Sequence, residues 1–161
     1  LDGKSRFIQR VDSFAYHCGL AALFGTGLDV RRDDYDYALA AKMLGIWHRA
    51  SEMLLFGDYC PLTPFHRDAA RWVARQFDCP ERGCGYIQGI RLPKCPEEVL
   101  TVFPQVTAPG STYRLENAES GATLVVSGAD LIREGFTFEL PRRSGAVWFY
   151  RIEPADPLPG S

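Results

Sequence analysis

The spacing of the apolar residues changes once along this chain, within the segment 57–64. Before this segment, apolar side chains recur every three or four residues, which is the period of an amphipathic helix; after it they alternate, which is the period of a strand. Gly57 can adopt the left-handed conformation that ends a helix, and Pro61 and Pro64 prevent the helix from continuing. The sequence therefore predicts two kinds of structure with a junction between them.

One long helix is predicted over residues 34–56, with Asp33 or Asp34 as its N-cap. Its apolar stripe consists of Tyr35, Leu39, Met43, Ile46, Trp47, Ala50 and Leu54. Residues 1–32 offer only one candidate strand, residues 21–25, to cover this stripe. We therefore expect the stripe to stay partly exposed, and a chain without residues 1–56 to be better behaved in solution.

The sequence of residues 70–153 predicts short strands separated by turns. The strands are expected at 72–77, 86–90, 99–103, 112–116, 122–126, 136–140 and 146–152. Strands of this length and spacing indicate an antiparallel β-sandwich. The residues expected in its core are Phe77, Val102, Leu115, Val125, Phe138 and Val147.

The composition restricts the class of protein. The chain has 161 residues, of which 46% are hydrophobic and 24% charged, as in globular proteins. Its formal net charge of −2 gives no basic excess for nucleic acid or an anionic membrane surface, so neither partner is expected. The chain starts at Leu1 without an apolar signal segment, and we expect it to be a fragment whose N-terminal part is missing.

The five cysteines do not form a recognisable framework. Their odd count argues against a complete set of disulfides. Cys79, Cys84 and Cys95 could be read as three metal ligands, but no Cys-x-x-Cys pair is present and no nearby His completes a tetrahedral set. Free thiols are expected, and no metal or other cofactor is predicted.

Four groups of residues, taken in order, share the pattern of one enzyme family. The first comprises Gly27–Arg31, Asp33–Leu39 and Trp47, and the second is the segment Phe56–Pro64. The third comprises Trp72, Gln76–Asp78, Pro80–Glu81, Gly83, Gly85, Gln88 and Arg91. The fourth comprises Tyr113, Gly121, Ser127–Gly128, Leu131, Gly135 and Phe136. Together they resemble the C-terminal part of a family 36 glycoside hydrolase of the α-galactosidase or melibiase type.

The resemblance implies a mainly β fold. Residues 61–161 would form a C-terminal antiparallel β-sandwich domain that caps and stabilises a barrel, and residues 1–60 the last β/α unit of that truncated (β/α)8 barrel. Such enzymes hydrolyse terminal α-galactosides with retention, using two aspartates roughly 5 Å apart. Both aspartates would lie upstream of the matched stretch, so no catalytic residue is expected here. The expected partners are the missing N-terminal barrel and, through the parent enzyme, a carbohydrate substrate.

Asp29 and Arg31 are the candidate substrate-binding residues, because they follow the last expected barrel strand and such positions line active sites. A loop ion pair is the simpler interpretation of the same two residues. Asp33, Asp34 and Asp36 suggest calcium, but capping of the helix explains them better. His48 and His66 are interpreted as surface or packing residues, and the segment 127–130 as a turn.

Two other functions remain open. Trp72, Tyr86, Trp148 and Tyr150 would form a sugar-stacking face if the chain were a stand-alone carbohydrate-binding module. Because large aromatic rings favour strands and the core, a packing role is the simpler interpretation. The second alternative is a purely structural β-sandwich module without a ligand.

Overall fold

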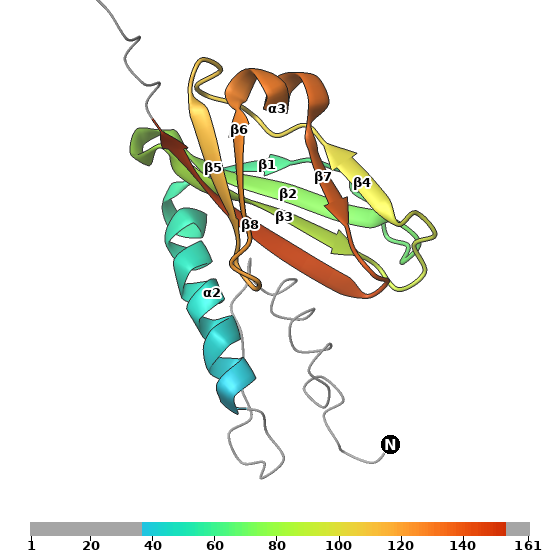
Figure 1. Cartoon of the computed structure of the whole chain (residues 1–161). Helices are drawn as coiled ribbons and strands as arrows, with labels where there is room; N and C mark the ends of the chain where they lie inside the picture. The colour runs from blue at the N-terminus through green and yellow to red at the C-terminus, as the bar shows by residue number, and fades with distance from the viewer. Residues whose placement is uncertain (1–36, 154–161) are drawn as a thin grey trace, which may run out of the picture.

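The computed structural model describes residues 37–153, except for the side chains of Leu39 and Ala40 (Figure 1). The candidate strand at 21–25, the proposed helix caps Asp33 and Asp34, and Tyr35 therefore lie outside the described residues. Within the described range the long helix is confirmed as α2, Tyr37–Phe56.

The described part of the chain is mainly antiparallel β-structure. The strands are β1 (Asp58–Pro61), β2 (Trp72–Cys79), β3 (Cys84–Arg91), β4 (Val99–Val102), β5 (Thr112–Asn117), β6 (Thr123–Ser127), β7 (Phe136–Glu139) and β8 (Ser144–Glu153). A 3₁₀ turn, η1 (Pro80–Arg82), joins β2 to β3, and helix α3 (Gly128–Glu134) follows β6. Six strands form one sheet in the order β1-β2-β3-β8-β5-β6, and β4 pairs with β7 in a second sheet.

All seven predicted strands are present, and the structure adds two elements that the sequence analysis missed. Strand β1 was interpreted as part of a junction because of its proline. Pro61 is tolerated there because β1 is an edge strand and the proline ends it. The segment 127–130 is not a simple turn: it begins α3, where the Ser127 hydroxyl accepts a 3.0 Å hydrogen bond from the backbone N–H of Asp130.

The two sheets pack face to face around the main core. That core contains buried residues from both sheets and from α3: Trp72, Ala74, Ile87, Cys95, Val102, Tyr113, Leu115, Leu131, Phe136, Phe138 and Tyr150. A β-carbon at Gly89 would lie 2.7 Å from the Phe138 ring, so this glycine lets β7 approach the middle of the large sheet. The predicted β-sandwich is confirmed in this arrangement.

The list of predicted core residues is correct except at β6. Phe77, Val102, Leu115 and Phe138 are buried, and Val147 is partly buried. The prediction for Val125 is wrong, since 55% of this residue is exposed. Val125 pairs with Arg114 on the face away from the sandwich core, whereas its neighbour Val126 packs against that core. Because side chains alternate along a strand, a register error of one residue exchanges the two faces.

Helix α2 covers the other face of the six-stranded sheet, away from β4 and β7 (Figure 1). Ala50 is buried together with Phe77, Tyr86 and Phe149, and Ile46, Met53 and Leu54 pack against this second cluster. The rings of Phe77 and Tyr86 stack at 5.1 Å, and Phe149 meets Tyr86 edge-on at 5.9 Å. The sheet is thus covered on both faces, by a helix and by a smaller sheet.

An ion pair fixes α2 to the β5–β6 side of the sheet. Arg49 donates to both carboxylate oxygens of Glu116, at 3.0 and 3.4 Å, and its guanidinium lies 4.0 Å from the centre of the Phe149 ring. The stripe, which was expected to stay partly exposed, is covered by the sheet in part: Met43 and Ala50 are buried, and Ile46, Trp47 and Leu54 are partly buried. The surface that covers the stripe comes from the sheet that follows the helix in the chain. The domain boundary at residue 60 remains a prediction; β1 spans it and pairs with β2.

Replacing Ala50 with glutamate tests the contact between α2 and the sheet. The new carboxylate would be placed among Phe77, Tyr86 and Phe149, so we expect the free energy of unfolding to fall by about 2 kcal/mol or more. Ala41→Glu, on the exposed side of the same helix, is the matched control and should change the stability little. Urea denaturation measures both; equal stabilities of the two variants would contradict the packing of α2 described here.

Candidate functional site

A buried polar network connects the two strands that flank β3. Asp78, Gly85 and Tyr150 lie opposite one another on β2, β3 and β8, and the Tyr150 hydroxyl donates a hydrogen bond to the Asp78 carboxylate. Gly85 makes this contact possible, because a β-carbon at that position would lie 2.2 Å from the Tyr150 hydroxyl oxygen. The side chain of Tyr150 therefore crosses β3 at Gly85, where β3 has no side chain.

Gln76 extends this network to the loop between β4 and β5. Its amide donates 2.9 Å hydrogen bonds to the Tyr150 hydroxyl and to the backbone carbonyl of Gln105. The backbone N–H of Gln105 donates to the Gln76 side-chain oxygen at 2.7 Å. Burial raises the pKa of Asp78, the Tyr150 hydrogen bond opposes this rise, and the charge of nearby Asp58 adds to it. Burial also raises the pKa of Tyr150, and Asp78 adds to the effect.

A second polar centre holds the connection after β3. Arg91 is buried and donates to the backbone carbonyls of Cys95, Pro96 and Leu140, with its shortest hydrogen bond at 2.8 Å to Leu140. Its guanidinium thus satisfies its donors on backbone oxygens and ties the loop 92–98 to the end of β7. These hydrogen bonds to backbone oxygens account for the burial of the Arg91 cation, so no ligand is assigned to it.

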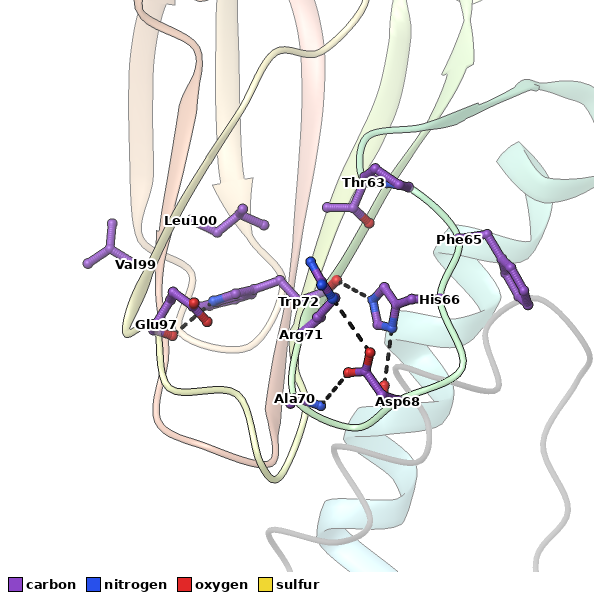
Figure 2. A pocket seen from close by; sticks show the side chains of 11 residues that line it. Thr63, Phe65, His66, Asp68, Ala70, Arg71, Trp72, Glu97, Val99 and Leu100 are labelled. Atoms are coloured by element: carbon purple, nitrogen blue, oxygen red, sulfur yellow. Dashed lines mark hydrogen bonds and ion pairs between the residues drawn. The ribbon is translucent and has the colours of Figure 1, made fainter.

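An open cleft of about 650 Å³ lies between the β1–β2 loop and the start of β4 (Figure 2). Trp72 forms part of its wall and is fixed by its indole N–H, which donates to the Glu97 carbonyl at 3.0 Å. His66 is fixed in the same way: its two ring nitrogens lie 2.9 Å from the Trp72 carbonyl oxygen and 3.1 Å from that of Asp68. The charged side chains at the opening of the cleft are those of Asp68, Arg71 and Glu97.

The cleft shows no arrangement for nucleophilic catalysis. A nucleophile and its base must be within hydrogen-bond reach of each other, but both nitrogens of His66 face backbone carbonyl oxygens. Asp68 accepts from the Ala70 N–H at 2.8 Å and pairs with Arg71 at 3.5 Å. The interpretation of His66 as a packing residue is confirmed; His48 is exposed on α2 with its ring 5.1 Å from the ring of Trp47.

The aromatic residues considered as a sugar-stacking face belong mainly to the core. Trp72, Tyr86 and Tyr150 are 5% exposed or less. Trp148 is partly buried and packs edge-on against Phe136 at 5.5 Å. Tyr86 and Trp148 also lie on opposite faces of the sheet, as their separate clusters show. The packing interpretation of these rings is therefore confirmed.

The cysteines do not converge on a metal. Cys79 and Cys84 lie at one end of the β2–β3 hairpin, and Cys95 follows its other end, roughly 20 Å away for a strand of this length. Residues 37–153 contain no group of three or more His, Cys, Asp or Glu side chains that could hold a metal ion. Within the same range, no helix is long and apolar enough to span a membrane. The four described cysteines are free thiols.

Asp29 and Arg31, the predicted substrate-binding residues, lie outside the described residues, as do Asp33, Asp34 and Asp36. The sequence analysis missed the network of Gln76, Asp78 and Tyr150. A signal for it was present: Gln76 and Asp78 continue the alternation that starts with Trp72 and Ala74, so they occupy core-facing positions of β2. Polar residues at such positions require hydrogen-bond partners inside the protein.

The stability of the network should depend on pH through Asp78. Its pKa is raised in the folded state, so its contribution to stability is complete below the pKa of the unfolded chain and is lost as the pH rises through the folded value. Asp78→Asn keeps an oxygen that accepts from Tyr150 but does not ionise. We expect the stability of wild type to decline as the pH rises above the pKa of an unfolded aspartate, about 4, and the variant to lose part of this decline.

Urea denaturation at a series of pH values measures this difference. Glu119→Gln, an exposed carboxylate in the β5–β6 turn, is the control and should leave the pH profile of wild type unchanged. An Asp78→Asn profile parallel to that of wild type would show that Asp78 does not titrate differently in the folded chain.

Comparison with known proteins identifies this fold. No family model matches the sequence, and no curated protein matches it. Solved structures do match: the α-galactosidase from Lactobacillus brevis has a TM-score of 0.64 and 13% sequence identity, covering 89% of this chain and 20% of that one. The GH36 α-galactosidase AgaB from Geobacillus stearothermophilus has a TM-score of 0.56 and 14% identity, covering 72% and 16%.

A third match is the galactosidase domain of the α-galactosidase–sucrose kinase AgaSK, with a TM-score of 0.57, 14% identity, and coverage of 77% of this chain and 17% of that one. The chain thus spans about a fifth or less of the length of the proteins it matches. At these identities the comparison concerns the fold. The resemblance seen in the sequence is confirmed at that level: the chain has the fold of the C-terminal β-domain of family 36 α-galactosidases.

Proposed function

We propose that the chain is the C-terminal part of an α-galactosidase-like glycoside hydrolase that acts on terminal α-galactosides with retention. The observation that carries the proposal is the fold: each solved structure named above is an α-galactosidase or a galactosidase domain, and each is several times longer than this chain. In this proposal the β-domain caps and stabilises a catalytic barrel, and the carbohydrate substrate binds through the parent enzyme.

The charges in residues 37–153 agree with a non-catalytic domain. Asp78 is the only buried carboxylate in that range, and Tyr150 holds it in the core, away from the open cleft. A retaining glycosidase needs two carboxyl groups about 5 Å apart across the bond that is cleaved. The proposal therefore places the nucleophile and the general acid/base upstream of this chain, as the family resemblance implies.

The proposed docking site for the barrel is a group of exposed apolar side chains. Leu55, Phe56 and Tyr59 lie within five residues at the end of α2 and the start of β1, and each is more than half exposed. Large apolar side chains gathered on a surface are typical of an interface with another domain. We propose that this group packs against the barrel in the parent enzyme.

The purified chain should not hydrolyse nitrophenyl α-galactosides, because it would lack both catalytic aspartates. A longer chain, extended along the reading frame upstream of Leu1, should contain two further aspartates at strand ends and should release nitrophenol. The assay follows the absorbance of nitrophenolate, with a known α-galactosidase as the positive control. Turnover by residues 1–161 that a single substitution within them abolishes would contradict the proposal.

Asp29 and Arg31 are proposed to contact sugar hydroxyls at the end of the last barrel strand. In the extended enzyme, Asp29→Asn and Arg31→Gln should each raise the KM for a nitrophenyl galactoside by about tenfold, the loss expected for one good hydrogen bond to a charged group. Glu52→Gln, exposed on α2, is the control and should leave KM unchanged. Unchanged KM values in both variants would favour the simpler interpretation as a loop ion pair.

A further inference from the structure

Cys79 and Cys84 lie directly opposite each other in the β2–β3 hairpin. Cys79 is the last residue of β2 and Cys84 the first residue of β3, with only the η1 turn between them. The register is fixed by eight consecutive pairs, from Trp72 with Arg91 to Cys79 with Cys84. The turn is closed by a 3.1 Å hydrogen bond from the Gly83 N–H to the Pro80 carbonyl, with Gly83 in the left-handed conformation.

This position satisfies the backbone requirement of a disulfide. Residues directly opposite in an antiparallel pair have Cα atoms about 4.5–5.5 Å apart, and their side chains lie on the same face. Disulfides join residues whose Cα atoms are about 4.4–6.8 Å apart. The two thiols therefore need only side-chain rotations to meet, without any change in the pairing of the strands.

The two thiols differ in their access to solvent. Cys79 is buried, with its sulfur 3.9 Å from the Met53 carbonyl near the end of α2, and burial and then the neighbouring Cys84 raise its pKa. Cys84 is only partly buried. An oxidant in solution consequently reaches Cys84 first, and Cys79 is placed to react with the product.

We propose that Cys79 and Cys84 are a redox-active pair that forms an internal disulfide with small disulfides such as oxidised glutathione. The Cys84 thiolate attacks one sulfur of oxidised glutathione, and one glutathione thiolate leaves. Cys79 then gives up its proton to solvent and attacks the Cys84 sulfur, and the second glutathione leaves. Two protein thiols are oxidised to one disulfide, and one molecule of oxidised glutathione is reduced to two thiols.

The other described cysteines have no comparable partner. Cys60 lies opposite Gln76 on β2. Cys95 is fully buried, and its thiol donates to the Glu97 carboxylate at 3.3 Å. Both are expected to stay reduced under the same conditions. This expectation makes the proposal specific to one pair.

The test uses the full chain, incubated in its native state with oxidised glutathione at pH 8 and then acidified to stop exchange. Thiol titration in denaturant should find that two of the five thiols are lost. Because Arg75, Arg82 and Arg91 flank the two cysteines, trypsin releases Cys79 and Cys84 on separate peptides, residues 76–82 and 83–91. Mass spectrometry without reduction should find these two peptides joined.

Three variants distinguish disulfide formation between Cys79 and Cys84 from other thiol reactions. Cys79→Ser should accumulate a stable mixed disulfide of glutathione at Cys84, and Cys84→Ser should leave Cys79 reduced. Cys60→Ser is the matched control and should still lose two thiols. A persistent glutathione adduct on Cys84 of wild type, a link from either cysteine to a third one, or retention of both thiols would each overturn the proposal.

Discussion

Strand β3 is buried on both faces, and the rest of the described structure depends on this constraint. Seven of its eight residues are buried, from Gly85 to Arg91. One face lies under β7 and α3, and the other lies under α2. A strand covered twice cannot carry a large side chain at every position, because its neighbours must also reach across it. Gly85 and Gly89 provide the two gaps, which the rings of Tyr150 and Phe138 occupy. Large aromatic rings over strand glycines recover the packing area that the glycines lack.

Burial of β3 also determines where the polar groups of the core are placed. Tyr150 crosses Gly85 and brings its hydroxyl to Asp78, so the cost of burying that hydroxyl is offset by a hydrogen bond. Gln76 then satisfies both its amide and its carbonyl on Gln105 and fixes the β4–β5 loop over the sheet. Tyr86 shows the opposite case: its hydroxyl is buried and has no hydrogen-bond partner among the described residues. That face is held instead by stacking of Phe77, Tyr86 and Phe149.

The sequence predicted the strands well because their signals are local. The signals for the strands expected at 112–116 and 136–140 depend on neighbours in the chain, and both predictions agree with the structure. Errors arose where the partner is distant. The extent to which α2 is covered could not be predicted, because Phe77, Tyr86 and Phe149 come from strands that follow it in the chain. Val125 was placed in the core because an apolar residue on an edge strand does not reveal which face it occupies. The cleft was not predicted, because loop 62–71 and residues 97–100 come together only in the folded chain.

The contact between α2 and the sheet restricts how a barrel can meet this domain. One side of α2 packs against the sheet through Ala50, Ile46 and Met53. Its opposite side carries Ala38, Ala41, Gly45, His48 and Glu52, which are exposed and offer little apolar area. Among the described side chains of α2, the large exposed apolar ones are Tyr37 at its start and Leu55 and Phe56 at its C-terminal end. Since burial of apolar area drives stable association between domains, a barrel in the proposed parent enzyme would contact the last turn of α2 and the adjoining strand β1. The helix would then belong physically to the β-domain along most of its length, even if its sequence resembles a barrel helix.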